Sequence, residues 1–271
     1  MKNIGSKILK GVVYTSAVVT FGVLLLLISY ILIKGIPNIK PSLFEFEYNT
    51  ENVSLMPSVI NTLVIMVCAL IVAVPLGIFT SIYLTEYAKR GNKLVNIIRL
   101  TAETLSGIPS IVYGLFGMLF FVTYLKWGYS ILAGAATLSI MILPLVMRTS
   151  EEALKAVPDS YREASFGLGA GNLRTVFRVV LPSAIPGILA GVILAMGRIV
   201  GESAALIYTA GTVAEMPENL LSSGRTLSVH MYALSGEGLY MDEAYATAVI
   251  LLIFVLIINM ASSFIARRLG K

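Results

Sequence analysis

The stretch YREASFGLGAGNLRTVFRVVLP, residues 161–182, decides the fold because it interrupts an apolar chain with charge and glycine. It holds four charged side chains and three glycines, and uncharged stretches long enough to cross a membrane lie on both sides of it. Charges are excluded from hydrocarbon unless they are paired or hydrated, so a segment of this kind is expected in the water beside the bilayer. Residues 161–182 therefore predict a surface element of a membrane protein.

The composition of the whole chain agrees with this interpretation. Of its 271 residues 57% are hydrophobic and 13% are charged, and the mean hydropathy is +0.86, whereas soluble domains carry about 25% charged residues. The single cysteine, Cys68, excludes a disulfide framework, and its apolar surroundings predict a core position. One cysteine and one histidine, His230, are too few for a zinc or haem site. We expect no metal and no cofactor.

Six stretches are long and apolar enough to form transmembrane helices, because about 20 residues at about 1.5 Å each cross the hydrocarbon layer. They lie near residues 12–33, 57–85, 104–125, 128–147, 179–207 and 244–266. The apolar part of the first is too long for a signal peptide and has no Ala-x-Ala cleavage site. The predicted fold class is an all-α integral membrane protein, with residues 1–271 as a single domain and residues 148–182 as a long loop.

The basic residues predict the orientation of these spans, because they resist translocation and stay on the cytoplasmic side. With the N-terminus inside, fifteen of the 20 Lys and Arg residues lie inside. Lys34, Lys40, Lys126 and Arg225 lie outside, and Arg198 falls within or beside the fifth span. Both termini and the loop 148–182 are therefore expected in the cytoplasm. The net charge of +5 follows from this topology, and no basic soluble face indicates a nucleic-acid partner.

The long loop itself predicts a short exposed helix. Residues 160–166 have helical spacing, Asp159 or Ser160 suits the helix start, and the three glycines suit its end. A second amphipathic piece follows and is expected to stop at Leu181-Pro182. A short surface helix held between two membrane helices is suited to docking on another protein.

The same loop resembles the "EAA" loop of ABC importer permeases, with serine in place of the second alanine. The residues that carry the resemblance are Glu163, Ala164, Ser165, Gly169, Leu181 and Pro182. It implies a fold like that of type I importer permeases, and a helix that couples the membrane domain to a dimer of separate ATP-binding subunits. An ordinary amphipathic helix at the membrane surface is the alternative.

No motif in the chain supports catalysis. The sequence has no G-x-x-x-x-G-K-[ST] loop for nucleotide phosphates, and the glycine run 167–171 follows no predicted strand. No Ser/His/Asp or Cys/His set is grouped in the sequence. We therefore expect a subunit that is not an enzyme and whose energy comes from another polypeptide.

Arg198 and Glu202 are the charges that a bilayer should exclude. Four residues apart, they are expected on one face of the fifth span, within reach of each other. A guanidinium offers a planar fork of donors for two oxygens of an oxyanion, and a nearby carboxylate neutralises it when no anion is bound. The pair therefore predicts an anion pathway, and the alternative is a structural ion pair or a position at the outer interface.

Three further passages resemble the permeases of phosphate-specific ABC importers, in particular their A-type subunit. They are GIPSIVYGLFG (107–117), GESAALIYTAG (201–211) and SGRTLSVHMY (223–232). The resemblance implies that Arg198, Glu202 and Ser203 line the pathway. Where that subunit is expected to have proline, this chain has Ala205, which leaves the local helix geometry open.

The residues Gly107, Pro109 and Ser110 predict a break near the start of the third span. Proline cannot donate its backbone hydrogen bond, and broken helices in a membrane are tolerated where they line a cavity. A helix start at such a break favours an anion. A packing kink is the alternative.

The expected outer segments are acidic, which favours an anion delivered by a protein over a free one. Their acidic residues are Glu45, Glu47, Glu51, Glu215, Glu218, Glu237, Asp242 and Glu243. His230 is interpreted as structural. We hypothesise a multi-pass permease of the cytoplasmic membrane that imports phosphate with a homologous but different second permease, an ATPase dimer and an extracytoplasmic phosphate-binding protein. The alternatives are another oxyanion (sulfate, molybdate or phosphonate), an ion-coupled secondary transporter, and a membrane structural protein without an ATPase.

Overall fold

The computed structural model describes residues 2–89 and 91–269, and within these ranges every regular element is a helix. In chain order these elements are α1 (Lys2–Gly35), η1 (Ile36–Asn38), η2 (Pro41–Phe44), α2 (Met56–Ile82), η3 (Tyr83–Tyr87), α3 (Lys93–Ser106), α4 (Ser110–Gly117), η4 (Met118–Tyr124), α5 (Ile131–Lys155), α6 (Asp159–Gly167), α7 (Asn172–Thr175), η5 (Val176–Val180), α8 (Leu181–Val200), α9 (Ala204–Ile207), α10 (Leu227–Glu237) and α11 (Met241–Leu269). The elements η3, η4 and η5 are π-helical turns. The all-α fold is thereby confirmed.

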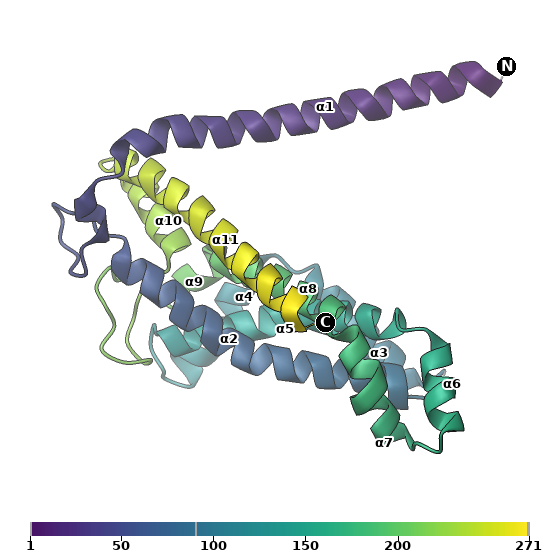
Figure 1. The fold of residues 1–271 in the computed structure, drawn as a ribbon. Helices are drawn as coiled ribbons and strands as arrows, with labels where there is room; N and C mark the ends of the chain where they lie inside the picture. Colours follow the sequence, from purple (N-terminus) through teal and green to yellow (C-terminus); the bar gives the residue numbers. More distant parts are fainter. Residues whose placement is uncertain (1, 90, 270–271) are drawn as a thin grey trace.

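Five helical segments of the described chain are long and apolar enough to cross a membrane, and a sixth consists of two helices joined at a sharp bend. Helix α5 lies at the centre of the bundle, with α2 and α8 packed along it (Figure 1). Two thirds of its most apolar window, 67%, is buried inside the chain. The core around it is built from residues such as Ile65, Leu138, Ile142, Val146 and Ile199.

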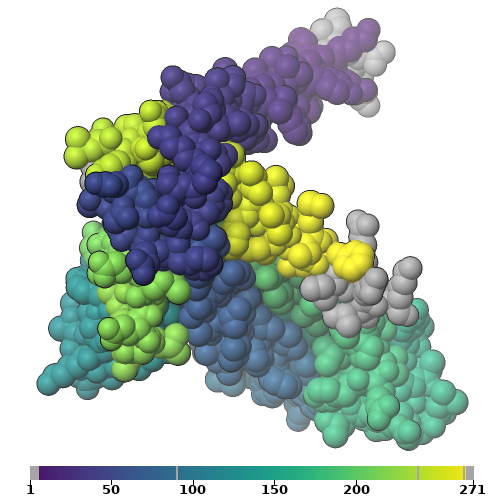
Figure 2. Space-filling view, turned by 60° about the vertical axis from the view of Figure 1, so that its left-hand side comes forward, coloured from purple at the N-terminus to yellow at the C-terminus, as the bar shows by residue number. Residues whose placement is uncertain are grey.

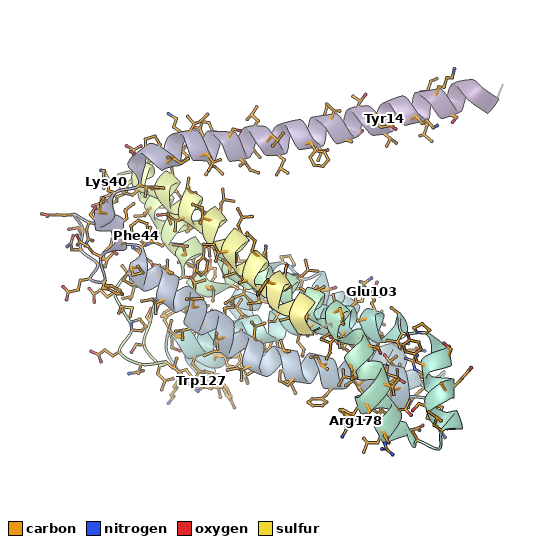
Figure 3. All side chains as sticks on the ribbon, in the orientation of Figure 1. Tyr14, Lys40, Phe44, Glu103, Trp127 and Arg178 are labelled. Atoms are coloured by element: carbon orange, nitrogen blue, oxygen red, sulfur yellow. The ribbon has the colours of Figure 1, made fainter. Side chains whose placement is uncertain are left out.

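Helix α1 leaves the bundle and extends away from it (Figures 1 and 2). None of its most apolar window is buried inside the chain, and Tyr14 projects from it with no other helix nearby (Figure 3). Its contact with the bundle lies at its C-terminal end, where Gly35 packs directly on the backbone of Tyr245 and the ring of Tyr30 meets that of Tyr245 edge-on. Lipid or another subunit has to cover the rest of this apolar helix.

The predicted third span, 104–125, is not one continuous helix. Helix α3 ends at Ser106, α4 begins at Ser110, and the two axes differ by 101°. The sequence Gly107-Ile108-Pro109 makes this break, since Pro109 adopts an extended ψ of 140° and caps the start of α4. The expected break is confirmed, but it is a sharp corner between two helices rather than a kink within one.

The expected stop at Leu181-Pro182 is wrong. The chain stays helical from Asn172 to Val200, through α7, the π turn η5 and α8. A proline inside an α-helix clashes with the carbonyl four residues earlier. Here the wide turn Val176–Val180 directly precedes α8 and opens the backbone where that carbonyl lies. The helix therefore passes through Pro182 without ending.

Two further helix ends differ from the expected ranges. Helix α5 continues past residue 147 to Lys155, because Ser150, Glu151 and Leu154 still face the interior and are buried. The fifth span, predicted over 179–207, ends as a helix at Val200, and α9 is a separate four-residue helix. These ends set the positions of the charged residues described below.

Two glycines of α8 provide a matched test of packing. A Cβ on Gly191 would collide with the side chain of Thr149 on α5, 2.6 Å from its Cβ, whereas a Cβ on Gly197 would meet no atom within 4 Å. We expect Gly191→Ala to destabilise the subunit by about 1–3 kcal/mol through overpacking, and Gly197→Ala to be neutral or stabilising, since alanine favours helix. Thermal unfolding of the two purified variants measures the difference. Equal midpoints would contradict the close α5–α8 contact.

Candidate functional site

The helix α6 projects from one end of the molecule, the α6 end, and α10 lies towards the other (Figure 1). Within α6 the side chains of Glu163 and Ala164 are exposed. Leu168, directly after it, is 89% exposed. The α6 end therefore presents a small, partly apolar surface that nothing else in this chain covers.

The turn after α6 depends on Gly169 and Ser165. Gly169 has a φ of +81°, a conformation that side chains disfavour. The buried hydroxyl of Ser165 shares a 2.8 Å hydrogen bond with that of Thr175 on α7, which gives the serine at this position a structural role. Leu181 is partly buried and Pro182 is exposed, both at the start of α8. Residues 161–182 thus form a helical hairpin.

Arg162 ties this hairpin to the bundle. Its guanidinium makes a two-point ion pair with Glu86 of η3, at 2.7 Å and 3.1 Å. It also donates to the backbone carbonyls of Val157 and Leu154, while a 3.2 Å contact reaches Asp159. The side chains of Arg162 and Glu86 are only 16% and 8% exposed. A paired, two-point contact of this kind fixes orientation as well as position.

The prediction that Arg198 and Glu202 share a helix face is wrong. Helix α8 ends at Val200, so the chain turns between the two residues. Glu202 is buried, and its carboxylate accepts a 3.0 Å hydrogen bond from the N–H of Ala205 at the start of α9. Arg198 is exposed within this chain, and no ion pair joins it to Glu202 among the described residues. Ser203 sits at the N-cap of α9 without a side-chain capping bond.

Arg198 instead lines a hollow of about 310 Å³ between α3, α5 and the end of α8. Pro144 and Leu145, near the midpoint of α5, lie beside it. Since α5 is about 37 Å long at 1.5 Å per residue and Lys155 at its end also lines the hollow, the hollow extends from the middle of the bundle to the C-terminal end of α5. The charged residues that line the hollow are Arg99, Glu103, Arg148, Glu151, Glu152, Lys155 and Arg198.

Most of these cations already have a carboxylate partner. Glu151 receives Arg99 at 2.7 Å and Lys155 at 2.6 Å, and Glu152 receives Arg148 at 3.2 Å. Arg198 has no ion pair or hydrogen bond within the described residues. The guanidinium in the middle of the bundle is therefore available to an anion that enters the hollow.

The break between α3 and α4 adjoins the same hollow. Ser106, the last residue of α3, lines it. Gly107 continues the turn, Pro109 caps α4 and Ser110 begins it. The hydroxyl of Tyr113 donates a 2.8 Å hydrogen bond to the carbonyl of Leu105, which also accepts a 3.1 Å bond from the N–H of Ile108. This bond holds the corner in place.

Sequence reasoning missed most of the hollow. The sequence places Arg99, Arg148 and Lys155 only among the basic residues expected on the inner side of the membrane. One pattern in the sequence indicates part of the hollow, because residues 148, 152 and 155 fall on one face of α5. The partners from α3 lie about fifty residues away in the sequence, and no local pattern indicates them.

Comparison with known proteins places the chain in a family. Residues 73–271 match the family described as "Binding-protein-dependent transport system inner membrane component". A probable ABC transporter permease protein of Bacillus subtilis, YqgI, is 34% identical over all of this chain and 98% of its own length. The phosphate transport system permease protein PstA 2 of Mycobacterium bovis is 36% identical over 75% of this chain and 68% of its own length.

A solved structure shares the fold. In the crystal structure of a bacterial alginate ABC transporter in complex with an alginate pentasaccharide-bound periplasmic protein, one chain matches with a TM-score of 0.68. The match is 14% identical in sequence and covers 99% of this chain and 98% of that one. The helical bundle, the relatives and the family match agree. The chain belongs to the family of binding-protein-dependent transport system inner membrane components, as a permease subunit of an ABC importer.

Proposed function

We propose that this permease imports inorganic phosphate across the cytoplasmic membrane. It forms the anion pathway together with a second, homologous permease. An ATPase dimer hydrolyses ATP and acts on it through residues 161–182, and an extracytoplasmic phosphate-binding protein delivers the anion. The phosphate permease names of relatives such as PstA 2 support the choice of phosphate.

The unpaired guanidinium of Arg198 is the observation on which the pathway proposal rests. It lines a hollow that extends from the middle of α5 to the C-terminal end of that helix. Arg148 pairs with Glu152, while Arg99 and Lys155 share the carboxylate of Glu151. An anion in this hollow gains one unpaired cation without a large excess of positive charge around it. Binding of that kind is strong enough to hold an anion and weak enough to release it.

The exposure of α6 supports the coupling role. Glu163, Ala164 and Leu168 face outward at the α6 end, and Arg162 connects this surface to the bundle. A force applied to α6 by an ATPase is therefore transmitted to α2 through η3. The turn at Gly169 keeps α6 at a fixed angle to α7.

Another oxyanion is the second candidate. A guanidinium matches the oxygens of sulfate as well as those of phosphate. Sulfate differs in having no proton to donate, so the carboxylates of the hollow favour hydrogen phosphate. The exposed Glu103 is the one carboxylate lining the described hollow that has no ion pair.

Transport by the reconstituted complex tests the proposal. Vesicles that hold both permeases and the ATPase, with the binding protein outside and ATP inside, are expected to accumulate labelled phosphate. A tenfold excess of unlabelled phosphate should suppress the signal, and the same excess of sulfate should leave it nearly unchanged. If sulfate suppresses the uptake of labelled phosphate more than unlabelled phosphate does, or if only labelled sulfate is taken up, the transported anion is sulfate and not phosphate.

A further inference from the structure

Arg225 is a buried cation without a carboxylate partner among the described residues. It lies two residues before the first residue of α10, Leu227, and is 5% exposed. Its Nε and Nη2 atoms are buried and make no hydrogen bond, and no carboxylate of the described residues lies within 4 Å of the guanidinium. Removing a charge from water without a counter-charge is strongly unfavourable. The fold therefore holds Arg225 in a place where only an anion from outside the chain can neutralise it.

The groups around Arg225 add no negative charge. The ring of Tyr48 lies 4.9 Å below the guanidinium carbon and meets the ring of His230 edge-on. His230 is fully buried beside the backbone of Val53. Burial and then the charge of Arg225 lower the pKa of His230 to about 3, so it is neutral at physiological pH. A ring face attracts the guanidinium but does not cancel its charge.

The start of α10 packs against the second turn of α2 at this position. The N–H of Leu227, in the first turn of α10, donates a 2.9 Å hydrogen bond to the hydroxyl of Thr62 on α2. The side-chain amide of Asn61 donates to the carbonyl of Arg225. The start of a helix carries partial positive charge that falls off within its first turn, so α10 adds to the field of Arg225.

Two carboxylates of this region are engaged elsewhere. Glu45 accepts a 2.8 Å hydrogen bond from the amide of Asn52, and Glu202 caps α9. The bond from Asn52 to Glu45 and a bond from Tyr240 to the carbonyl of Thr50 hold the loop of residues 45–54, which carries Tyr48. Glu47 and Glu51 of the same loop are exposed, and no carboxylate of the described residues forms an ion pair with Arg225.

We propose that Arg225 forms the centre of a second binding site for a small oxyanion such as phosphate or sulfate, beside the start of α10. The guanidinium supplies a two-point donor through its unpartnered Nε and Nη2 atoms, and the start of α10 adds a positive field. The site is distinct from the hollow at Arg198, and it does not depend on phosphate being the transported cargo.

The burial of Arg225 favours a small free anion over a carboxylate of another polypeptide. A carboxylate of a partner would have to bring its backbone up to a residue that is 5% exposed, whereas a small anion has no backbone to accommodate. The α10 segment also contacts the turn that follows Arg198, because the hydroxyl of Ser228 donates to the carbonyl of Glu202. An anion at Arg225 is therefore positioned next to the segment that leads to the hollow.

Equilibrium binding of labelled phosphate to the assembled transporter, without its binding protein, tests this site. All variants carry Arg198→Gln, which removes the unpaired cation of the hollow. This background is expected to bind about one phosphate per chain, with sulfate as an effective competitor and acetate as a poor one. Adding Arg225→Gln should weaken binding at least tenfold, and Arg225→Lys should weaken it less. Lys126→Gln, which removes an exposed cation elsewhere, should leave it unchanged.

Three results would overturn the site. They are no phosphate binding in the Arg198→Gln background, binding that survives Arg225→Gln, and competition by acetate equal to that by sulfate. If the Arg225→Gln variant does not assemble, the affinity of the Arg225→Lys variant tests the site, because lysine keeps the charge and loses the planar fork. Unchanged phosphate and sulfate affinity in that variant would contradict recognition by the guanidinium. The uptake assay reports separately on the proposed function.

Discussion

Replacing Arg162 with alanine is expected to reduce phosphate uptake at least tenfold while the membrane bundle stays folded. The substitution leaves Glu86, whose side chain is 8% exposed, without its cation and frees two backbone carbonyls. Breaking a buried ion pair on one side costs about 3–5 kcal/mol. That loss falls on the attachment of α6, so ATP hydrolysis should continue without transport. Uptake and ATPase activity of the same vesicles measure the uncoupling.

Two control variants make the Arg162 prediction specific. Asp159→Asn removes only the contact to a carboxylate that is 84% exposed, and it should leave uptake almost unchanged. The charge swap Glu86→Arg with Arg162→Glu should not restore transport, since a glutamate at 162 cannot donate to the carbonyls of Val157 and Leu154. Full rescue by the swap would show that charge alone, not the backbone attachment, matters at this position.

Replacing Arg198 with glutamine is expected to nearly abolish phosphate uptake, with a loss of about a hundredfold or more. The variant removes the one cation lining the described hollow that has no carboxylate partner. A charge-assisted hydrogen bond contributes about 1.5–3 kcal/mol, and two parallel bonds are lost. Arg198→Lys should also be defective, since a point charge lacks the fork. Uptake normalised to assembled complex provides the measurement.

Glu202 gives the control for Arg198. In Glu202→Gln the amide oxygen can still accept from the N–H of Ala205, so this variant should keep most of its uptake. The double variant Arg198→Gln with Glu202→Gln should be no better than Arg198→Gln alone, because the two side chains are not paired in the fold. Near-normal uptake in the double variant would mean that Arg198 only balances Glu202.

The helix α6, the turn after it and the break before α4 were predictable because their signals are local. Gly169 adopts a positive φ, Pro109 begins α4 instead of continuing α3, and helical spacing appears within seven residues of the sequence. The wrong prediction that Arg198 and Glu202 share a helix face also has a local cause. Counting four residues assumes an unbroken helix, and the segment Gly201-Glu202-Ser203 ends α8 because Glu202 bonds to the start of α9 instead of continuing the turn.

The remaining features depend on contacts between distant parts of the chain. Arg162 and Glu86 are 76 residues apart, and Asn61 is 164 residues from Arg225. A glutamate or an arginine in a loop is normally exposed, so nothing in the sequence indicated that Glu86 and Arg225 are buried. The continuation of the helix through Pro182 could not be predicted either, because a π turn has no clear sequence signature.

The isolation of α1 determines how the chain can fold. None of its most apolar window is buried inside the chain, against 67% for α5. Every interior backbone group of such a helix is satisfied within the helix itself, so it is stable in a bilayer before it meets any neighbour. The insertion of α1 into the bilayer is therefore a separate event from its association with other helices. Helix α5, which carries Ser139, Ser150 and Glu151 in its buried face, gains its stability only as the others assemble around it. The free energy of unfolding from a denaturation curve of this subunit therefore reflects the assembly of helices around α5 and contains almost no contribution from α1.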